Sequence, residues 1–243
     1  TENKKIIHVD INTEMFDKTI QSNYHVHMDS KKFINLLDNN LFNNISSKEW
    51  LSHLDELKSE NKFKFRIPEK EKINTPMVIS KINELTLNKK EDVIFTTGVG
   101  NHQMMAYQFI HGNYPGKIHS SGSLGVMGAG LPYAIGAQIA NPEKLVVDID
   151  GDSSFLMTMS DMKTIVENDL PVKIAIMNDS RQMMVNVWER LFFDERYTAT
   201  INKRNPNFKE VAEGFGIKGF KCSDAKNLEE ITREFLEYPG AAL

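Results

Sequence analysis

The chain has 243 residues, of which 40% are hydrophobic, 26% charged and 9% aromatic. This composition is that of an ordinary globular protein and excludes a mainly disordered, collagen-like or coiled-coil chain. Its 29 basic and 33 acidic residues give a net charge of -4, which points to neither a nucleic-acid nor an acidic-membrane partner. The single cysteine, Cys222, cannot form an intramolecular disulfide, and no apolar stretch is long enough to span a bilayer. We therefore expect a soluble protein that binds neither nucleic acid nor membrane.

The first 75 residues contain no glycine and are rich in Lys, Asn, Glu and Asp. Their pattern predicts two strands and three helices, at Lys5–Asp10, Glu14–Ile20, Tyr24–Met28, Lys31–Asn40 and Ser47–Glu60, in the order strand, helix, strand, helix, helix. Two strands do not form a stable sheet alone, so we expect residues 1–40 to be the end of a partial α/β domain. Residues 41–75 are expected to be a helical and charged linker.

From residue 76 onward, strand and helix patterns alternate. Strands are predicted at Val93–Thr97, Lys117–Ser120, Lys144–Ile149 and Val172–Met177. Helices are predicted at His102–Phe109, Val126–Ala140, Ser160–Asn168, Arg181–Phe193, Phe208–Phe215 and Leu228–Tyr238. This alternation predicts an α/β fold with a doubly wound, mainly parallel sheet and helices on both faces. A further strand is expected to begin near Gly240, so we expect the domain of residues 76–243 to be truncated at its C-terminus.

Acidic residues follow two apolar strands of this predicted sheet. Asp152 comes shortly after Lys144–Ile149, and Asp179 shortly after Val172–Met177. If the strands are neighbours, both carboxylates emerge at one edge, where ligands bind in doubly wound sheets, and can share one Mg²⁺ with the oxygens of a diphosphate. The alternative is that each aspartate is a helix N-cap. The glycine clusters do not match G-x-G-x-x-G, which argues against a dinucleotide site.

Longer motifs resemble a known family. Gly151-Asp152-Ser153, followed by 24 residues and Asn178-Asp179, resembles the thiamine-diphosphate motif GDG-x(24–27)-NN. The stretches at 97–104, 121–132, 170–174 and 184–200, the last with Met184-Val-x-x-Trp188, are similar to catalytic subunits of the acetolactate (acetohydroxyacid) synthase family. The resemblance covers nearly the whole chain, with 1–40 similar to the end of that family's FAD-binding middle domain and 76–243 to its thiamine-diphosphate domain.

The resemblance implies a role for each matching residue. Asp152, Asp179 and the backbone carbonyl of Arg181 would bind Mg²⁺. Contacts with thiamine diphosphate are implied for Asn101, His102, Gly125, Met127, Gly151, Ser153 and Asn178, and the side chain of Met127 would bend the cofactor. Met184 and Trp188 would line the substrate channel, with Met127, Met184 and Trp188 as the catalytic candidates. Contacts with FAD are implied for Asp10, Asp29, Gly122 and Ser123. From the residues alone, the pattern favours ordinary core side chains for Met127, Met184 and Trp188.

The implied reaction is the decarboxylation of pyruvate and the joining of the resulting two-carbon unit to a second 2-keto acid, such as 2-ketobutyrate, in branched-chain amino-acid biosynthesis. The resemblance also implies a homodimer or tetramer, a possible regulatory subunit, and a location in a plastid or mitochondrion, or in bacterial cytoplasm. In this family a glutamate of the N-terminal domain triggers the chemistry. The resemblance covers the end of the middle domain and the thiamine-diphosphate domain, so we expect the 243 residues alone to be inactive.

Two other functions remain open at this point. One is another thiamine-diphosphate enzyme, of the pyruvate oxidase or glyoxylate carboligase type. The other is a non-catalytic family member, because three positions depart from the family pattern: Ser153 for Gly or Ala, Asp179 for Asn and Met183 for Gly.

Overall fold

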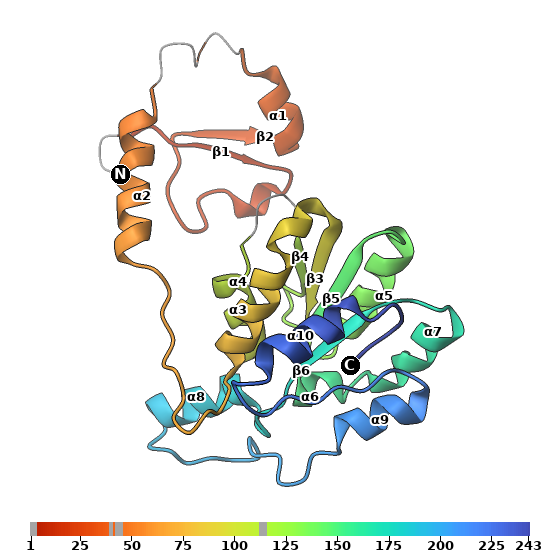
Figure 1. Cartoon of the computed structure of the whole chain (residues 1–243). Coiled ribbons are helices and arrows are strands. Elements are labelled where there is room, and N and C mark those ends of the chain that lie inside the picture. The colour runs from red at the N-terminus through yellow and green to blue at the C-terminus, as the bar shows by residue number, and fades with distance from the viewer. Residues whose placement is uncertain (1–3, 39–40, 42–45, 112–115) are drawn as a thin grey trace. The chain divides into compact units, whose positions relative to one another are not determined.

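The computed structural model describes residues 4–38, 41, 46–111 and 116–243. The chain divides into two compact units, Thr1–Lys62 and Phe63–Leu243, which are shown in Figure 1. In the described part of the chain, no helix combines the length and the apolar character needed to cross a bilayer.

The described residues of the first unit form two short parallel strands and two α-helices. Strand β1 (Ile7–Asp10) pairs with β2 (Tyr24–His27), and helices α1 (Ser30–Leu36) and α2 (Lys48–Glu60) follow. These elements lie where two strands and the last two helices were predicted. The helix predicted at Lys31–Asn40 is too long, because α1 ends at Leu36 and Leu37 is extended; Asn39 and Asn40 lie outside the described residues.

The helix predicted at residues 14–20 is wrong. Only a 3-10 turn, η1 (Thr13–Met15), forms there. Asp17 has a left-handed backbone with φ 57°, which ends the helical path. Its carboxylate accepts hydrogen bonds from the backbone amide and the hydroxyl of Ser22, both at 2.8 Å, and lies 3.0 Å from His25 Nε2. These contacts direct the chain toward β2 instead of into a second helical turn.

The second unit is built on a four-stranded parallel sheet, as predicted. Its strands lie in the order β4 (Ile118–Ser120), β3 (Val93–Thr97), β5 (Leu145–Gly151) and β6 (Lys173–Met177). In this register Thr97 lies beside Ile149, and Gly151 lies beside Met177, so β5 and β6 end side by side.

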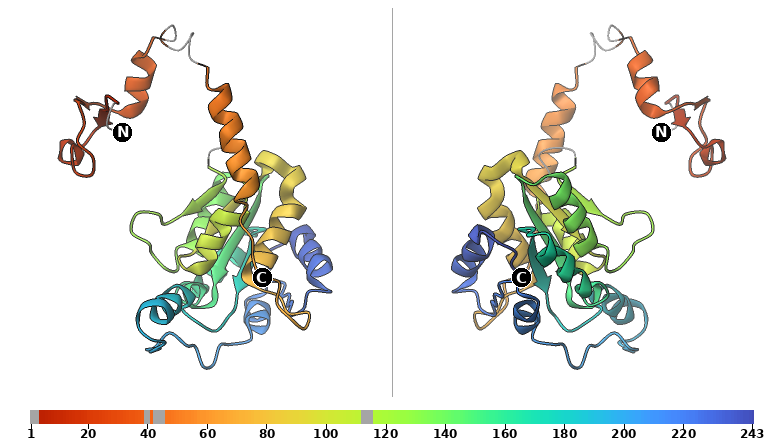
Figure 2. Two further views of the ribbon diagram at one scale, coloured as in Figure 1. Left: turned by 90° about the vertical axis from the view of Figure 1, so that its left-hand side faces the viewer. Right: turned by 90° about the vertical axis from the view of Figure 1, so that its right-hand side faces the viewer.

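Helices cover both faces of this sheet, as Figures 1 and 2 show. One face packs on α3 (Thr75–Thr86), α4 (Asn101–Phe109) and α10 (Leu228–Glu237). The other packs on α5 (Gly130–Ala140), α6 (Asp152–Phe155), α7 (Met162–Glu167) and α9 (Phe208–Phe215). The remaining helices of the described residues are η3 (Leu87–Asp92), η4 (Met159–Asp161) and α8 (Met183–Phe192).

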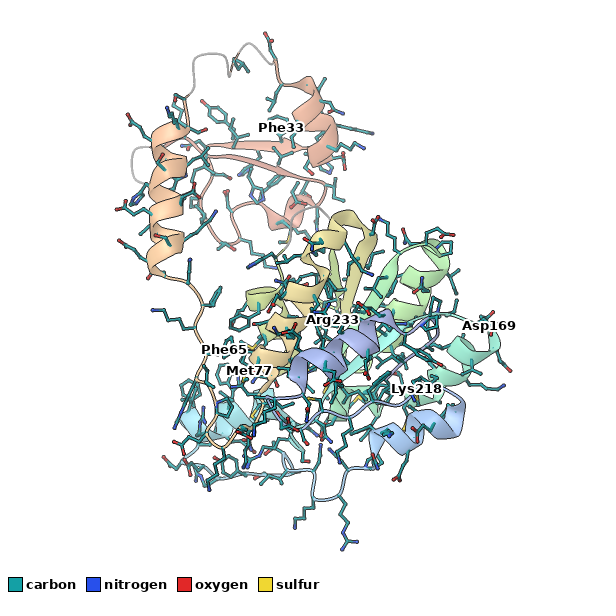
Figure 3. The ribbon with its side chains drawn as sticks, viewed as in Figure 1. Phe33, Phe65, Met77, Asp169, Lys218 and Arg233 are labelled. Atoms are coloured by element: carbon teal, nitrogen blue, oxygen red, sulfur yellow. The ribbon has the colours of Figure 1, made fainter. Side chains whose placement is uncertain are left out.

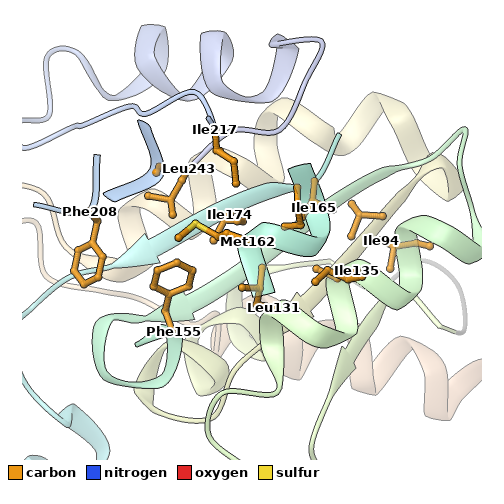
Figure 4. Close-up of a cluster of buried hydrophobic side chains, with 14 residues drawn as sticks. Ile94, Leu131, Ile135, Phe155, Met162, Ile165, Ile174, Phe208, Ile217 and Leu243 are labelled. Atoms are coloured by element: carbon orange, nitrogen blue, oxygen red, sulfur yellow. The ribbon is translucent and has the colours of Figure 1, made fainter. Parts of the chain in front are cut away.

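The two cores follow from the alternation of side chains along each strand. Ile94 and Val146 belong to the cluster on the α5 side, which Figure 4 shows with Phe155 and Phe208 packed edge to face. Their neighbours Phe95 and Val147 belong to the cluster on the α3 side. Because a buried parallel strand is apolar on both faces, the near-continuous apolar runs seen in the sequence are explained. Figure 3 shows charged residues such as Asp169, Lys218 and Arg233 at the surface of this unit.

Some element boundaries differ from the predicted ones. Helix α5 starts at Gly130 and not at residue 126, because Gly125 and Gly128 have left-handed φ angles of 66° and 80°. The sequence analysis missed α3, in which the side chain of Asn74 caps the helix by accepting from the amide of Met77. It also missed the short α6. Near the expected C-terminal strand, Ala242 forms isolated parallel bridges with Lys173 and Lys218.

Candidate active site

A cavity of about 170 Å³ lies at the carboxyl ends of the sheet's strands. Its lining comes from the segments that follow β3, β5 and β6, from the loop before α5, from α8 and from the start of α3. The predicted site residues that line it are Asn101, His102, Gly125, Met127, Gly151, Asp152, Asp179, Arg181 and Met184. Residues far apart in the sequence are therefore gathered at one place.

The two predicted acidic residues lie at this cavity. Asp152 follows β5 and Asp179 follows β6, and the two strands are adjacent and parallel. Partial burial, and then the negative charge of Asp152, raise the pKa of Asp179 to about 6. Both residues line the same cavity, so the two carboxylates share one environment. The requirement that both emerge on the same edge of the sheet is met.

The helix N-cap alternative is wrong for both aspartates. Asp152 is the first residue of α6 and makes no capping bond; its carboxylate instead accepts hydrogen bonds from the side chains of Asn202 and Asn205. Asp179 accepts a 3.0 Å hydrogen bond from the amide of Arg181, but the N-cap of α8 is Gln182. Both carboxylates thus lie at the strand ends, and neither serves as a helix N-cap.

His102 is seated between two glycines. A Cβ on Gly151 would lie 2.7 Å from His102 Nδ1, and a Cβ on Gly100 would lie 2.8 Å from His102 Cε1. The imidazole is buried, and its Nε2 lies 3.2 Å from Asp150 Oδ1 without forming a hydrogen bond within the described residues. The glycine before Asp152 is therefore required by the close approach of His102.

Two further carboxylates, near His102 and the cavity, are buried, and the sequence analysis missed both. Asp148 and Asp150 have no exposed surface, and their Oδ2 atoms have no hydrogen-bond partner in the described part of the chain. Burial and the adjacent Asp150 raise the pKa of Asp148 well above its ordinary range, although a 2.8 Å hydrogen bond from Thr96 opposes the shift. The pair lies between Gly98 and Gly130, where any side chain would collide with it.

Helix α8 contributes one wall and an exposed apolar surface. Met183 and Met184 line the cavity at its first turn. Trp188 is not among the lining residues; it is 57% exposed and its ring lies 4.9 Å from that of Phe192. The chain therefore brings Met184, but not Trp188, to the cavity.

Other predicted residues lie beside the cavity or away from it. Ser153 and Asn178 adjoin lining residues and accept hydrogen bonds from Asn202 and Asn205, respectively. Gly122 and Ser123 lie in the exposed loop after β4 and are not lining residues. In the first unit, the side chain of Asp10 accepts from the amide of Asn12, and Asp29 caps α1 by accepting from the amide of Lys32.

A sequence profile described as the C-terminal TPP-binding domain of thiamine pyrophosphate enzymes matches residues 98–243. The chain belongs to this family, and the cavity at the strand ends falls within the matched domain.

Individual relatives are named as acetolactate synthases or their subunits. The chain is 41% identical over 194 residues to the mitochondrial acetolactate synthase of Schizosaccharomyces pombe, a match that covers 79% of the chain and 29% of the relative. It is 36% identical to the mitochondrial catalytic subunit of Saccharomyces cerevisiae, over 98% of the chain and 35% of the relative. The Escherichia coli isozyme 2 large subunit is also 36% identical, over 79% of the chain and 34% of its own length. The chain spans about a third of the length of these relatives.

The cavity has the donors that a magnesium diphosphate group requires. Mg²⁺ prefers a few carboxylate and carbonyl oxygens and keeps other positions for water and phosphate. Among the described residues, no group of three His, Cys, Asp or Glu side chains is able to hold a metal, so Asp152 and Asp179 would act as a pair. The amides of Asn101 and His102, the first two residues of α4, precede the first amide that bonds to the Gly100 carbonyl, that of Gln103, and both residues line the cavity. Burial, and then the charge of Asp152, raise the pKa of Asp179, and a cation bound between the two carboxylates would favour the deprotonated form.

Proposed function

We propose that this chain supplies the thiamine-diphosphate site of an acetolactate synthase. Such an enzyme decarboxylates pyruvate and joins the two-carbon product to a second 2-keto acid, pyruvate or 2-ketobutyrate. The observation that carries the proposal is the meeting of Asp152 and Asp179 at one cavity, in a chain similar to acetolactate synthase catalytic subunits over 98% of its length. The names of these relatives do not favour the pyruvate oxidase or glyoxylate carboligase alternative.

For the metal, Asp152, Asp179 and the backbone carbonyl of Arg181 are the proposed ligands. The amide of Arg181 donates to Asp179, so the turn that carries the carbonyl and the carboxylate is fixed by a local hydrogen bond. Deprotonated Asp179 is the form that binds a cation, and its pKa of about 6 leaves it mainly in this form at neutral pH. This arrangement supports a hard cation with free positions for phosphate oxygens.

For the diphosphate, Asn101 and His102 are the proposed contacts, together with the N-terminal amides of α4. The ring of His102 is fixed against Gly100 and Gly151, so it does not need to be ordered when a ligand arrives. Gly151, Ser153 and Asn178 belong to the same proposed site. A preordered site of this kind reduces the entropy that binding must overcome.

For the thiazolium and aminopyrimidine rings, Gly125 and Met127 are the proposed contacts. The left-handed φ of 66° at Gly125 brings its backbone to the cavity, where a side chain would be strained. When bound, thiamine diphosphate supplies the electron sink for decarboxylation, and the protein supplies binding and orientation. Met184 is proposed to contact the keto acid; Trp188 is proposed to do so despite its exposed position, as the outer part of the substrate channel.

The remaining proposals concern FAD, assembly and location. Asp10, Asp29, Gly122 and Ser123 are proposed FAD contacts. The names of the relatives distinguish catalytic or large subunits, which supports a regulatory small subunit as a partner, and we propose a homodimer or tetramer. Two of the relatives are mitochondrial and one is bacterial, which supports a mitochondrion or plastid in a eukaryote and the cytoplasm in a bacterium.

Two measurements test the proposal. Calorimetric titration of the chain with Mg²⁺ and thiamine diphosphate is expected to give saturable binding, and its absence would favour a non-catalytic family member. Product analysis of the complete encoded enzyme, first with pyruvate and then with added 2-ketobutyrate, is expected to give the two acetohydroxy acids. Formation of acetyl phosphate or of a glyoxylate-derived product instead would contradict the assignment.

A further inference from the structure

The segment Thr198–Asn205, called here the 198–205 segment, lies across the carboxyl ends of β5 and β6. Its backbone pairs with the turn after β6. The amide of Gln182 donates to the carbonyl of Thr200 at 2.9 Å, and the amide of Asn202 donates to the carbonyl of Ser180 at 2.8 Å. Arg181 and Ile201 form the antiparallel bridge between these two bonds. The turn that carries Asp179 is therefore paired with the 198–205 segment.

Two asparagines of this segment hold the acidic strand ends. Asn202 Nδ2 lies 3.0 Å from Asp152 Oδ2 and 2.7 Å from Ser153 Oγ. Asn205 Nδ2 lies 2.5 Å from the same Asp152 oxygen and 2.8 Å from Asn178 Oδ1. An amide nitrogen carries two hydrogens, so each asparagine donates one to each of its two acceptors. Asn205 thus links the end of β5 to the end of β6.

Both amides bond to the same oxygen of Asp152. They occupy Oδ2, while Oδ1 makes no hydrogen bond to any residue that the structure describes. Asp152 is 1% exposed and lines the cavity, so its orientation is set by these contacts rather than by water. The arrangement fixes the carboxylate and leaves one oxygen for a further partner.

The other end of the segment is anchored on α8. Glu189, which is buried, accepts from the hydroxyl of Thr200 and, at 2.8 Å, from the amide of Thr198. Asn186 accepts from the guanidinium of Arg181 at 3.1 Å and donates to the hydroxyl of Thr200 at 3.1 Å. The segment is therefore fixed at both ends, and its two asparagines are presented in a defined position.

We propose that Asn202 and Asn205 are positioning residues for the divalent cation. Both act through Asp152: by holding Oδ2 they direct Oδ1 to the metal. Asn205 also bonds to Asn178 and so keeps the ends of β5 and β6 at the separation that one ion requires. This inference rests on the proposed function, since it concerns the same metal site. Groups that orient a metal ligand typically contribute 10- to 100-fold to metal affinity.

The test compares Asn205→Ala and Asn202→Ala with the wild-type chain. Calorimetric titration of Mg²⁺ at saturating thiamine diphosphate is expected to show about 10- to 100-fold weaker metal binding for Asn205→Ala, and a smaller loss for Asn202→Ala. Titration of the protein with Mn²⁺ alone, followed by electron paramagnetic resonance, is expected to rank the variants in the same order. A purely structural role would instead lower the unfolding midpoint of the metal-free protein and leave the Mg²⁺ affinity of the folded protein unchanged.

The matched control is Asn207→Ala. Asn207 lies two residues further along the chain and donates to Glu210 at 2.7 Å instead of to the strand ends. It is expected to keep wild-type Mg²⁺ affinity. Wild-type affinity in both test variants would overturn this inference while leaving the proposed function intact. Absence of Mg²⁺ binding by the wild-type chain would overturn the proposed metal site itself, and this inference with it.

Discussion

Replacement of Gly98 by alanine tests whether the buried carboxylates beneath the cavity have any room to move. Gly98 directly follows β3. An added Cβ would lie 2.0 Å from Asp150 Oδ1 and 2.2 Å from Ser154 Oγ. The φ angle of Gly98 is not in the left-handed region, so alanine is acceptable to the backbone. The cost of the change therefore comes from the collision and not from backbone strain.

The size of the collision sets the expected magnitude. An ordinary contact begins near 3.4 Å, so the Asp150 oxygen would have to move by about 1.4 Å, the difference between 3.4 Å and 2.0 Å. Such a movement is opposed because Asp150 has no exposed surface and its Oδ1 accepts a 2.8 Å hydrogen bond from the amide of Gly151. Overpacking costs about 1–3 kcal/mol and occasionally more. We expect Gly98→Ala to be at the upper end, about 3 kcal/mol, because the displaced group is a buried carboxylate.

The assay is urea-induced unfolding of Gly98→Ala, with Gly136→Ala as its matched control. Gly136 lies inside α5, and nothing lies within 4 Å of the position that its Cβ would take. Alanine in a helix interior is favoured over glycine by about 0.5–1 kcal/mol, so this variant is expected to be slightly more stable than wild type. A Gly98→Ala protein within about 0.5 kcal/mol of wild type, or equal shifts in the two variants, would refute the packing argument.

Three other changes have defined outcomes. Asp152→Ala is expected to abolish saturable Mg²⁺ binding in calorimetry, whereas Ser153→Ala is expected to keep it; equal affinity in both variants would argue against Asp152 as a ligand. Burial, and then the charge of Lys89, lower the pKa of Lys173 to about 8. Between pH 8 and pH 10.5, the ordinary pKa of lysine, this side chain is therefore more protonated in the unfolded chain than in the folded one. The free energy of unfolding should rise with pH in this window by at most ~1.4 kcal/mol per pH unit. Lys173→Met is expected to remove this rise in urea unfolding at pH 8 and pH 10, and an unchanged slope would contradict it. Thr200→Val removes the hydroxyl between Glu189 and Asn186 and is expected to destabilise the folded chain by about 1–3 kcal/mol, as thermal unfolding would show; an unchanged midpoint would contradict it.

The elements predicted best are those whose pattern decides them locally. The run Val93–Thr97 forms β3 with the predicted bounds, because β-branched and aromatic residues suit a strand that is buried on both faces. Helix α9 also has its predicted bounds, and Gly216 ends it with a left-handed φ of 87°. The failed helix at residues 14–20 shows the limit of such local patterns. There, contacts of Asp17 with Ser22 and His25, which no periodicity reveals, set the backbone.

The candidate site divides in the same way. The positions of Asp152 and Asp179 were predictable, because residues that follow parallel strands emerge at one edge and the register of β5 and β6 brings them together. The side chains that bond to Asp152 could not be predicted from the sequence. Asn202 and Asn205 lie in a polar stretch with no helix or strand pattern, and only the pairing of this stretch with the turn after β6 brings them to Asp152.

The positions of the proposed metal ligands and of the asparagines that hold Asp152 are determined in different ways. An acidic residue after an apolar strand is visible in sequence because the strand itself dictates where the carboxylate emerges. An amide that orients this carboxylate can come from any segment that crosses the strand ends, so its position along the chain carries no fixed spacing. The environment of Asp148 and Asp150 is also invisible in the sequence. Their alternation places both on one side of β5, but only the close approach of Gly98 and Gly130 in the fold shows that they are enclosed. The sequence therefore predicts which residues of such a site are ligands, whereas the contacts that orient these ligands become visible only in the fold.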